Sequence, residues 1–431
     1  MTLLNNRGET SIVYDVIIIG TGPAGLGAAF YLVENGIRSI LMVDKSRLCT
    51  GGLRNDCKQN YTFPVGFPED LWSREEADSL LEDVACHLEP RYEEHGNVEI
   101  FRKRAEKLGV KMLTVRQSHV GTDKSSALIR DLLAKLDSSG VEIRLSTEVS
   151  EVDWENSSVT IAGTGESLIF HNLIAAPGRA GYEWLQQIMD TMGVKYVDNV
   201  VDVGVRVEAR EDNYPVVRDY YDPKFIFPDG VRTFCTNSGA AFVVQEKYQN
   251  YYSVNGHAMS REKKSTGLVN FAMLKTITLT DPVVSGHQFA DALGQMAMRL
   301  SGGKPMMQRV GDFRMGKRSK ASTFNDDLYD FAPTLKGATP GDISLAVPSK
   351  ILRDIWRSMK MLDTIVPGIL HPSSILYYPE IKTYANRPEF IDRHFRVKRN
   401  VFIAGDGAGT SRGITAAWAS GIRAARGIVN G

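Results

Sequence analysis

Three glycines and one aspartate near the start of the chain suggest a binding chemistry. Gly20, Gly22 and Gly25 form the spacing G-x-G-x-x-G directly after the apolar run 16–19, and Asp44 follows about 20 residues later. Gly20 permits a tight turn, Gly22 lets the backbone approach a diphosphate, and Gly25 lets a helix pack on a strand. An acid at that distance accepts a hydrogen bond from a ribose hydroxyl and disfavours a 2′-phosphate. The pattern predicts a dinucleotide site.

A strand, a helix and a second strand must position these residues. Residues 16–19 and 40–43 are continuous apolar runs, as expected for strands buried on both faces, and residues 26–35 predict a helix that ends at Gly36. The turn residues Pro23 and Ala24 belong to the same site, because a helix N-terminus offers unpaired N–H groups to phosphates. The alternative is a βαβ unit that binds no nucleotide. The pattern at residues 163–165 lacks a third glycine and predicts a hairpin turn instead.

Three further segments carry glycines where a cofactor loop would need them. They are Lys45-Ser-Arg-Leu-Cys-Thr-Gly51-Gly52-Leu-Arg54, Asn172-Leu-Ile-Ala-Ala-Pro177-Gly178-Arg179 and Val401-Phe-Ile-Ala-Gly405-Asp406-Gly-Ala-Gly409. These segments resemble the glutathione-reductase-like flavoprotein superfamily, which implies FAD rather than NAD as the cofactor. For the last segment, a plain strand-to-helix loop is the alternative.

The resemblance implies further cofactor-binding residues. Asp406 would bind the ribityl or phosphate part of FAD, and Val149 would contact adenine through its backbone. Backbone N–H groups near the start of the last helix would stabilise negative charge on the reduced flavin. The cofactor residues implied in this way are Lys45, Gly51, Gly52, Arg54, Val149, Pro177, Gly178, Gly405, Asp406, Arg412, Gly413 and Ile414.

Motifs spread over nearly the whole chain narrow the resemblance. The chain is similar to an FAD-dependent dehydrogenase family with its own C-terminal domain in the segments His119-Val-Gly-Thr-Asp123, Val203-Gly-Val-Arg-Val-Glu208, Val254-Asn-Gly-His257, Ala338-Thr-Pro-Gly-Asp342 and 405–413. The segment 49–57 departs from the loop expected there. Since that loop should lie near the flavin, the departure suggests a different substrate.

The order of the predicted elements gives an α/β fold class. We expect a Rossmann-type FAD-binding domain with a βββ-type insertion, and a second, mixed α+β substrate domain. The discontinuous FAD-binding domain is expected at 12–70, 110–180 and 375–431. A helical insertion is expected at 71–109 and the substrate or cap domain at 181–374.

The composition argues against several classes of protein. Lys+Arg and Asp+Glu are both 51, and this zero net charge gives no long-range field for nucleic acid. The basic segment 314–320 is explained equally well by a solvated face, a phosphate contact or nucleic acid. Four cysteines do not make a disulfide framework, and no apolar run reaches the length of a membrane span. We therefore expect a soluble cytoplasmic protein with reduced thiols and no metal site.

Candidates for proton transfer near a flavin are few. His257 could relay a proton, with a structural histidine as the alternative. Glu380 and Lys382 lie where the two domains should meet, and on a strand they would share one face, with a plain salt bridge as the alternative. Cys57 could contact the flavin alone or act with Cys49 as a dithiol. The spacing of this pair differs from that of the flavin disulfide reductases.

These features predict an FAD-dependent dehydrogenase or reductase that acts on a small organic substrate at the flavin between the two domains. No second G-x-G-x-x-G follows a buried strand, so a dedicated NAD(P)H domain is not expected. NAD(P)H docking on the flavin, the substrate itself or a redox protein remain open as electron sources. The rival functions are a flavin monooxygenase and a non-catalytic FAD redox sensor.

Overall fold

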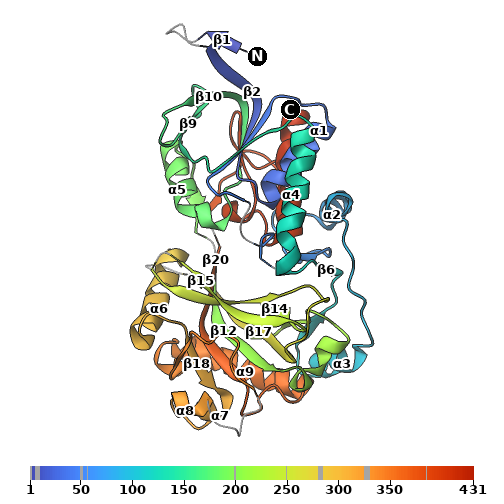
Figure 1. Ribbon diagram of the computed structural model, residues 1–431, viewed down its shortest axis with the longest axis vertical. Coiled ribbons are helices and arrows are strands. Elements are labelled where there is room, and N and C mark those ends of the chain that lie inside the picture. Colours follow the sequence, from blue (N-terminus) through green and yellow to red (C-terminus); the bar gives the residue numbers. More distant parts are fainter. Residues whose placement is uncertain are drawn as a thin grey trace. The chain divides into compact units, whose positions relative to one another are not determined.

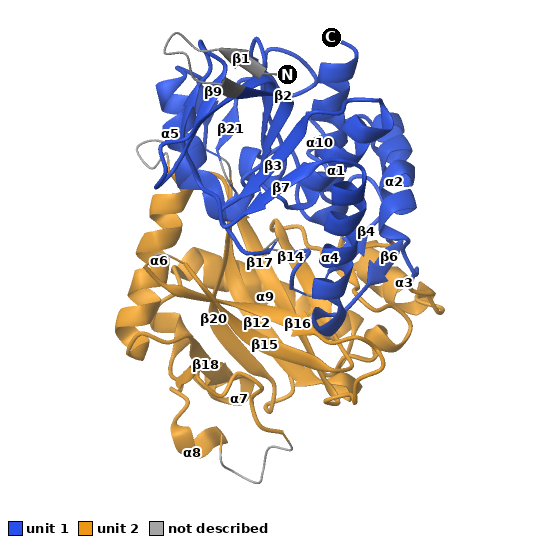
Figure 2. Ribbon diagram, turned by 45° about the horizontal axis from the view of Figure 1, so that its top comes forward, with its two compact units in different colours: residues 1–92, 115–199, 384–431 blue, residues 93–114, 200–383 orange. Residues whose placement is uncertain are grey.

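The computed structural model describes most of the chain, in nine ranges. They are residues 2–4, 10–48, 52–55, 57–198, 200–248, 250–279, 285–324, 331–384 and 386–431. The predicted cofactor residue Gly51 and the thiol of Cys49 lie outside them. The chain divides into two compact units, one of residues 1–92, 115–199 and 384–431 and the other of residues 93–114 and 200–383 (Figure 2).

The boundaries of these units differ from the expected domain limits. Residues 71–92 belong to the first unit, because the helix Arg74–Leu88 packs against the last helix of the chain. Residues 93–109 belong to the second unit, in which the following strand Lys111–Leu113 pairs with Lys224–Ile226. Residues 375–383 also belong to the second unit, since they pair along their length with Val201–Arg210.

The first unit is built on a nine-stranded sheet. Its strands are β1 (Thr2–Leu4), β2 (Thr10–Ile19), β3 (Ile40–Asp44), β7 (Glu142–Leu145), β8 (Val149–Asp153), β9 (Ser158–Ile161), β10 (Ser167–Ala175), β22 (Arg396–Lys398) and β23 (Val401–Ile403). The central strands run in parallel in the order β23-β10-β2-β3-β7. Strands β8, β9 and β10 form an antiparallel meander, which is the predicted βββ insertion. Two short pairs lie outside this sheet, β4 (Lys58–Asn60) with β6 (Gln117–His119) and β11 (Tyr196–Val197) with β21 (Arg387–Pro388).

Alternate residues of the buried strands face two different cores. Ile18 and Met42 face a core shared with α1 (Pro23–Glu34), α2 (Arg74–Leu88), α4 (Thr122–Ser138) and α10 (Ile414–Val429). Ile17 and Leu41 face a second core, which includes α5 (Tyr182–Thr191) and the β8–β9 hairpin. In Figure 1, α1 and α4 accordingly lie on one side of the sheet and α5 on the other. Burial on both faces explains why residues 16–19 of β2 and 40–43 of β3 are apolar at every position.

The second unit is built on an eight-stranded, mostly antiparallel sheet. In spatial order its strands are β19 (Thr339–Pro340), β18 (Met306–Arg309), β20 (Ile375–Thr383), β12 (Val201–Arg210), β17 (Leu268–Ile277), β14 (Val231–Asn237), β13 (Lys224–Ile226) and β5 (Lys111–Leu113). A separate hairpin joins β15 (Ala241–Lys247) to β16 (Tyr252–Ala258). The helices of this unit are α3 (Glu99–Lys107), α6 (Gly286–Ser301), α7 (Val310–Arg314), α8 (Ala321–Phe324) and α9 (Ser349–Ile365).

The predicted fold class is confirmed, with differences in detail. Helix α1 begins at Pro23 rather than at residue 26, because proline is already set for the first helical position. Residues 73–109 are not one helical stretch. Helix α2 ends before Glu89, which adopts a left-handed conformation with φ 44°, and α3 begins ten residues later at Glu99. The predicted hairpin turn at 163–165 lies between the antiparallel strands β9 and β10.

Candidate functional site

The carboxyl ends of three parallel strands meet at one edge of the first unit's sheet. Ala176, after β10, donates its N–H to the carbonyl of Ile19 at the end of β2, with an N–O distance of 2.8 Å. Ala404, after β23, donates in turn to the carbonyl of Ala175, at 3.0 Å. The loops after β2, β10 and β23 therefore lie side by side, although they come from distant parts of the sequence. This is the edge at which open parallel sheets bind ligands.

The three glycines of the fingerprint have different surroundings. A Cβ at Gly20 would lie 2.2 Å from the carbonyl oxygen of Ala176, and one at Gly25 would lie 1.9 Å from that of Gly20. A Cβ at Gly22 would meet no protein atom within 4 Å, and its φ of −71° is open to any residue. Packing therefore requires Gly20 and Gly25, whereas nothing in the described chain requires Gly22. A ligand that lies against the backbone would explain this glycine.

The start of α1 offers donors at the same place. Gly22 is the N-cap and makes no side-chain capping bond, and Pro23 has no N–H. The N–H groups of Ala24 and Gly25 thus have no capping partner among the described residues, while Leu26 already donates to the carbonyl of Gly22 at 2.9 Å. Two free N–H groups and the positive end of a helix dipole suit a diphosphate.

Asp44 is held in place by its neighbours. Its Oδ2 accepts from the backbone N–H of Thr21 at 2.9 Å and from the Thr21 hydroxyl at 2.8 Å, and its Oδ1 accepts from the N–H of Ser46 at 2.8 Å. Because an ionised carboxylate has about four lone-pair positions, a hydroxyl ligand can still bind to Oδ1. The next residue, Lys45, is exposed. The Asp44 carboxylate is thus oriented by its neighbours and can still accept a further hydrogen bond.

Residues 146–149 run past this acid. Ser146 donates its N–H to the carbonyl of Ser46 at 2.9 Å, and Thr147 donates to the carbonyl of Asp44 at 2.8 Å. Val149, which opens β8, is buried and pairs with Ile161. The backbone around Val149 is therefore close in space to the end of β3, as contact with an adenosine group would require.

The second carboxylate, Asp406, lies in the loop after β23. Its Oδ1 accepts from the Ser411 hydroxyl at 2.8 Å, and its Oδ2 accepts from the N–H of Gly413 at 3.0 Å. Burial raises the pKa of this carboxyl. The positive charges of Arg179 and Arg412 and the two hydrogen bonds oppose that rise in pKa. The carboxylate fixes the turn that leads into α10.

The N-terminus of α10 is also uncapped by any described side chain. Its N-cap, Gly413, has a φ of 89°, and a Cβ there would meet nothing within 4 Å. The N–H groups of the first turn, beginning at Ile414, point out of the helix start, so they can stabilise an anion. The guanidinium of Arg412 stacks on the ring of Tyr384, 3.8 Å from its centroid. This end of α10 combines a helix dipole with a fixed cation.

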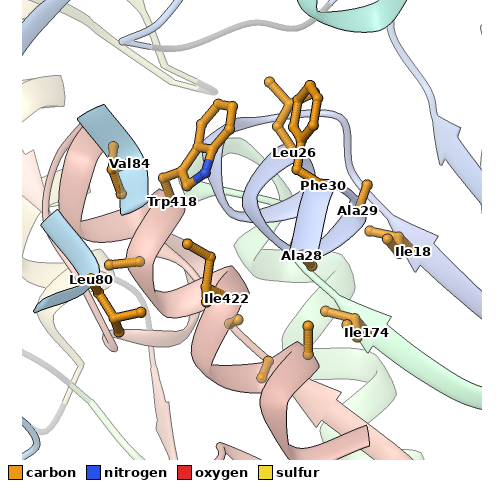
Figure 3. Packing of buried hydrophobic residues seen from close by; sticks show 14 of the residues in the cluster. Ile18, Leu26, Ala28, Ala29, Phe30, Leu80, Val84, Ile174, Trp418 and Ile422 are labelled. Carbon is orange, nitrogen blue, oxygen red and sulfur yellow. The ribbon is translucent and has the colours of Figure 1, made fainter. Parts of the chain in front are cut away.

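The first and last helices of the chain are packed closely enough to act as one support. A Cβ at Gly421 would lie 1.8 Å from the carbonyl oxygen of Ala24, and one at Gly27 would lie 2.3 Å from that of Trp418. Trp418 also stacks on Phe30, with ring centroids 5.7 Å apart (Figure 3). Gly27 and Gly421 thus let α1 and α10 cross at backbone contact, which fixes the two helices relative to each other.

Residues 61–72 brace the same loop from outside. Arg412 donates its N–H to the carbonyl of Gly66 at 2.8 Å, and Trp72 donates its indole N–H to the carbonyl of Thr410 at 2.8 Å. A Cβ at Gly66 would lie 2.3 Å from the carbonyl oxygen of Arg412. Arg423 of α10 lies over the ring of Trp72, 4.6 Å from its centroid, which ties this brace to the helix.

The remaining predicted cofactor residues are distributed around this edge. Gly405 has a φ of 89° and faces Ala24 of α1, and Gly178 has a φ of 65° with nothing within 4 Å of a Cβ. Pro177 is half-buried beside Gly178. Gly52 faces Ile414, whose Cγ1 lies 3.6 Å from a Cβ there. Arg54 is half-buried, and its carbonyl accepts from the hydroxyl of Ser125 at 2.5 Å. The described residues among the eighteen predicted thus cluster on the strand-end edge or the adjoining loop.

Cys57 is buried in the first unit in a left-handed conformation, with φ 50°. Its thiol accepts from the amide of Gln59 at 3.4 Å, and the Gln59 carbonyl oxygen accepts from the hydroxyl of Tyr61 at 2.7 Å. Burial raises the pKa of Tyr61 well above its usual range. The dithiol hypothesis requires Cys49, which lies outside the described residues.

Glu380 and Lys382 lie in a buried ionic cluster of the second unit. Both oxygens of Glu380 accept from Arg206, each at 2.7 Å, and the Lys382 ammonium lies 3.6 Å from Glu380 and 3.3 Å from Glu246. Arg206 and Glu380 are fully buried. The two predicted residues do share a face of β20, and the salt bridge foreseen as the alternative is present.

His257 lies on β16, opposite Phe242 of β15, and is half-buried. Ser253 of the same strand joins β16 to β20, since its hydroxyl accepts from the N–H of Ile381 at 3.0 Å. Gly256 is pressed against the ionic cluster, because a Cβ there would lie 2.3 Å from a guanidinium nitrogen of Arg206. The structure therefore places all three second-unit candidates in one region of that unit.

Several residues at these places were not predicted from the sequence. Thr21 orients Asp44, Gly66 makes room for Arg412, and Arg206 neutralises Glu380. For Arg206 a signal was available, because polar residues alternate with valines along β12, which predicts one polar face. For Thr21 and Gly66 the partners are chosen by tertiary packing, and the local sequence carries no signal.

Two family models match the chain. Residues 13–168 match a family described as "FAD binding domain", and residues 214–383 match a family described as "FAD-dependent protein, C-terminal domain-like". The first match spans the glycine fingerprint, Asp44 and Val149. The second spans the unit that holds His257, Glu380 and Lys382.

Curated relatives are distant. The chain is 28% identical over 212 residues to an uncharacterized protein of Methanosarcina barkeri, which covers 48% of this chain and 45% of that protein. It is 28% identical over 123 residues to the thiamine thiazole synthase of Methanococcus maripaludis, which covers 28% of this chain and 42% of the synthase. The matches thus span less than half the length of either relative.

Solved structures with a related arrangement are numerous but remote. A glycine oxidase from Bacillus cereus gives a TM-score of 0.42 at 14% identity, over 96% of this chain and 94% of the oxidase. A geranylgeranyl bacteriochlorophyll reductase-like protein from Thermoplasma acidophilum gives 0.42 at 14% identity, over 97% and 79%. The family matches, rather than these similarities, identify the cofactor.

Two absences apply to the described ranges alone. Within them, no helix combines the length and the apolar character that a membrane crossing needs, and no three His, Cys, Asp or Glu side chains gather as metal ligands. The family matches on both segments agree with the glycine-lined edge of the first unit. The protein is a flavoprotein whose cofactor is FAD, because residues 13–168 match an FAD-binding domain and residues 214–383 match a C-terminal domain of FAD-dependent proteins.

Proposed function

We propose that the protein is an FAD-dependent dehydrogenase or reductase of the glutathione-reductase-like superfamily, acting on a small organic substrate. The observation that carries the proposal is the open backbone at Gly22, with the oriented carboxylate of Asp44 beside it and the uncapped start of α1 behind it. The open backbone at Gly22 and the uncapped start of α1 serve no packing contact among the described residues, whereas a dinucleotide uses both together with Asp44.

The chain's own residues have distinct tasks in this proposal. The N–H groups of Ala24 and Gly25 hold the diphosphate, and Asp44 accepts from a ribose hydroxyl. Asp406 holds the turn before α10 and accepts from the ribityl or phosphate part of the cofactor. FAD, when bound, supplies the hydride or electron step.

Residues at the start of α10 tune that step. The first-turn N–H groups, from Ile414 onward, and the Arg412 guanidinium present positive charge where a reduced flavin carries negative charge. Since Tyr384 and Gly66 fix Arg412, this charge needs no rearrangement when the flavin is reduced. The first-turn backbone of α10 and the side chain of Arg412, which precedes the helix, would thereby favour the reduced, anionic state.

For proton transfer, His257 is the stronger second-unit candidate. Its ring is half-buried, whereas Glu380 is saturated by Arg206 and Lys382 has two carboxylate neighbours. An imidazole is the side chain best suited to taking up and releasing a proton near neutral pH. Alanine at His257 should therefore lower turnover with FAD content retained. Full turnover of His257→Ala would remove that residue from the mechanism.

The decisive experiment is a visible spectrum of the purified protein, followed by identification of the released cofactor. Flavin absorption and release of FAD support the proposal, and a colourless folded protein that ignores added FAD contradicts it. Anaerobic reduction by substrate or NAD(P)H then separates the rival functions. NADPH oxidation coupled to product oxygenation would indicate a monooxygenase, and slow reduction by every donor would indicate a redox sensor.

A further inference from the structure

A cavity in the second unit lies outside every residue assigned above. Its volume is about 340 Å³, within the range of small-molecule sites. It is formed by the end of α7, the second half of α9 and the loop that follows α9. The lining residues are Arg314, Trp356, Lys360, Asp363, Gly368, Leu370, His371 and Pro372.

The cavity is positively charged although the chain as a whole has no net charge. The side chains of Arg314 and Lys360 are exposed and make no ion pair or hydrogen bond with the described residues. The one carboxylate, Asp363, is engaged, because its Oδ1 accepts from the N–H groups of Gly368 at 3.1 Å and Leu370 at 3.0 Å. Two cations thus face one carboxylate that the loop already binds.

His371 contributes a further donor. Its Nδ1 accepts from the backbone N–H of Ser373 at 3.2 Å and lies 2.7 Å from the Ser373 hydroxyl. Since Nδ1 is an acceptor here, the neutral ring carries its proton on Nε2. Two cations and an N–H donor from three separate segments therefore surround one cavity, which favours an anion.

The cavity also has an aromatic wall. Trp356 is half-buried, and its ring packs against Phe313 with centroids 4.9 Å apart. This contact fixes the indole, so it can serve as a rigid surface for a planar ring. Arg314 belongs to the basic segment 314–320, and the fold brings it to Trp356 and Lys360 of α9.

We propose that this cavity binds a small aromatic anion, by chemical class a nucleoside monophosphate. Its anionic group interacts with Arg314 and Lys360, and its ring packs on Trp356. The site consists of second-unit residues alone and contains none of the residues assigned to FAD. The proposal therefore goes beyond the proposed function and does not depend on it.

The test is a calorimetric titration of the protein, saturated with FAD, with adenosine 5′-monophosphate. Saturation with FAD prevents the nucleotide from occupying the cofactor site. We expect one nucleotide per chain, and at least tenfold weaker binding of inorganic phosphate or of adenosine. The double variant Arg314→Gln/Lys360→Gln should weaken nucleotide binding at least tenfold, and Trp356→Leu at least threefold.

Lys350→Gln is the matched control, because Lys350 is an exposed lysine at the other end of α9. It should change nucleotide binding less than twofold. An unchanged melting temperature and FAD content will show that the variants are folded. No binding by the wild-type protein, equal binding by the double variant, equal loss in Lys350→Gln, or binding of phosphate or adenosine as tight as that of the nucleotide would each overturn the proposal.

Discussion

The two units hold their carboxylates in different ways. In the first unit, Asp44 and Asp406 accept hydrogen bonds from neutral N–H and hydroxyl donors. In the second unit, Glu380 is saturated by the guanidinium of Arg206, and both side chains are fully buried. Neutral donors orient a carboxylate and leave its charge available to a ligand, whereas the bidentate guanidinium of Arg206 neutralises the charge of Glu380 and binds both of its oxygens. A carboxylate that is oriented by neutral donors and not neutralised by a cation therefore indicates a binding site better than the presence of a charge alone does.

Five glycines, three of the first unit and two of the second, show a related difference. At Gly22, Gly178 and Gly413 of the first unit, a side chain would meet no protein atom within 4 Å. At Gly204 and Gly256 of the second unit, a Cβ would lie 1.8 Å and 2.2 Å from the nearest atom, so packing explains those glycines. Gly178 and Gly413 also have positive φ values, of 65° and 89°, which favour glycine, so Gly22 is the one of these glycines that neither packing nor backbone conformation requires.

The largest effect is expected where the Arg206–Glu380 ion pair of the second unit is broken. Arg206→Met removes the bidentate partner of the buried Glu380 and leaves it with the Lys382 ammonium, 3.6 Å away and shared with Glu246, so we expect a loss of about 3–5 kcal/mol in the free energy of unfolding. Chemical denaturation measures this loss. The double variant Arg206→Met/Glu380→Met should recover most of it, since no uncompensated charge remains. A loss below about 1 kcal/mol in the single variant would mean that the pair is not buried as described.

The next effect concerns Gly22, where a side chain would meet no protein atom. Gly22→Val fills the space at the start of α1, and we expect FAD affinity to fall roughly 100-fold, or about 2.7 kcal/mol, with the stability of the apoprotein nearly unchanged. Gly36→Ala is the control. Gly36 is also uncrowded but has a φ of 83°, so alanine there should cost stability and leave FAD affinity intact. Titration of the apoprotein with FAD, and its melting temperature, measure both. Equal FAD affinity in Gly22→Val would contradict the ligand explanation.

A smaller effect is expected at Asp44. Asp44→Asn should weaken FAD binding about tenfold, because it removes the charge and turns an amide N–H toward donors. Thr21→Val removes only the hydroxyl that orients Asp44, and we expect a loss of roughly threefold. Fluorescence titration of the flavin can resolve these steps. If Thr21→Val weakens binding more than Asp44→Asn, the threonine contacts the cofactor itself.

The smallest effect is a pH dependence in the first unit. The His87 ring packs on Phe30 and Trp418, with centroids 4.5 Å and 5.6 Å away, and burial lowers its pKa, with Glu34 opposing. The unfolded chain, in which His87 has its ordinary pKa, binds a proton more readily, so stability present at neutral pH is lost on acidification. Between about pH 7.5 and 5.5 we expect a loss below roughly 1 kcal/mol. His87→Phe should reduce this loss, and an unchanged pH profile would mean that His87 is protonated without cost.

Much of the fold could be predicted because its signals are local. Apolar runs of strand length, the helix that follows Gly22 and the acid at the end of β3 all lie within one short stretch of chain. The period-two placement of Glu380 and Lys382 on β20 is equally local and is confirmed. The sequence left open what these two residues contact, because Arg206, the partner of Glu380, is 174 positions away.

The sequence by itself determined that the chain builds a glycine-lined strand-to-helix turn, since backbone freedom, helix start and strand burial depend on neighbouring residues. Only the tertiary structure decided which groups complete it. Thr21 reaches Asp44, Gly66 makes room for Arg412, and the last helix meets the first at Gly421 and Gly27. These contacts depend on close packing between segments far apart in the chain. Shape and donor geometry determine the partners there, and the local sequence pattern does not predict them.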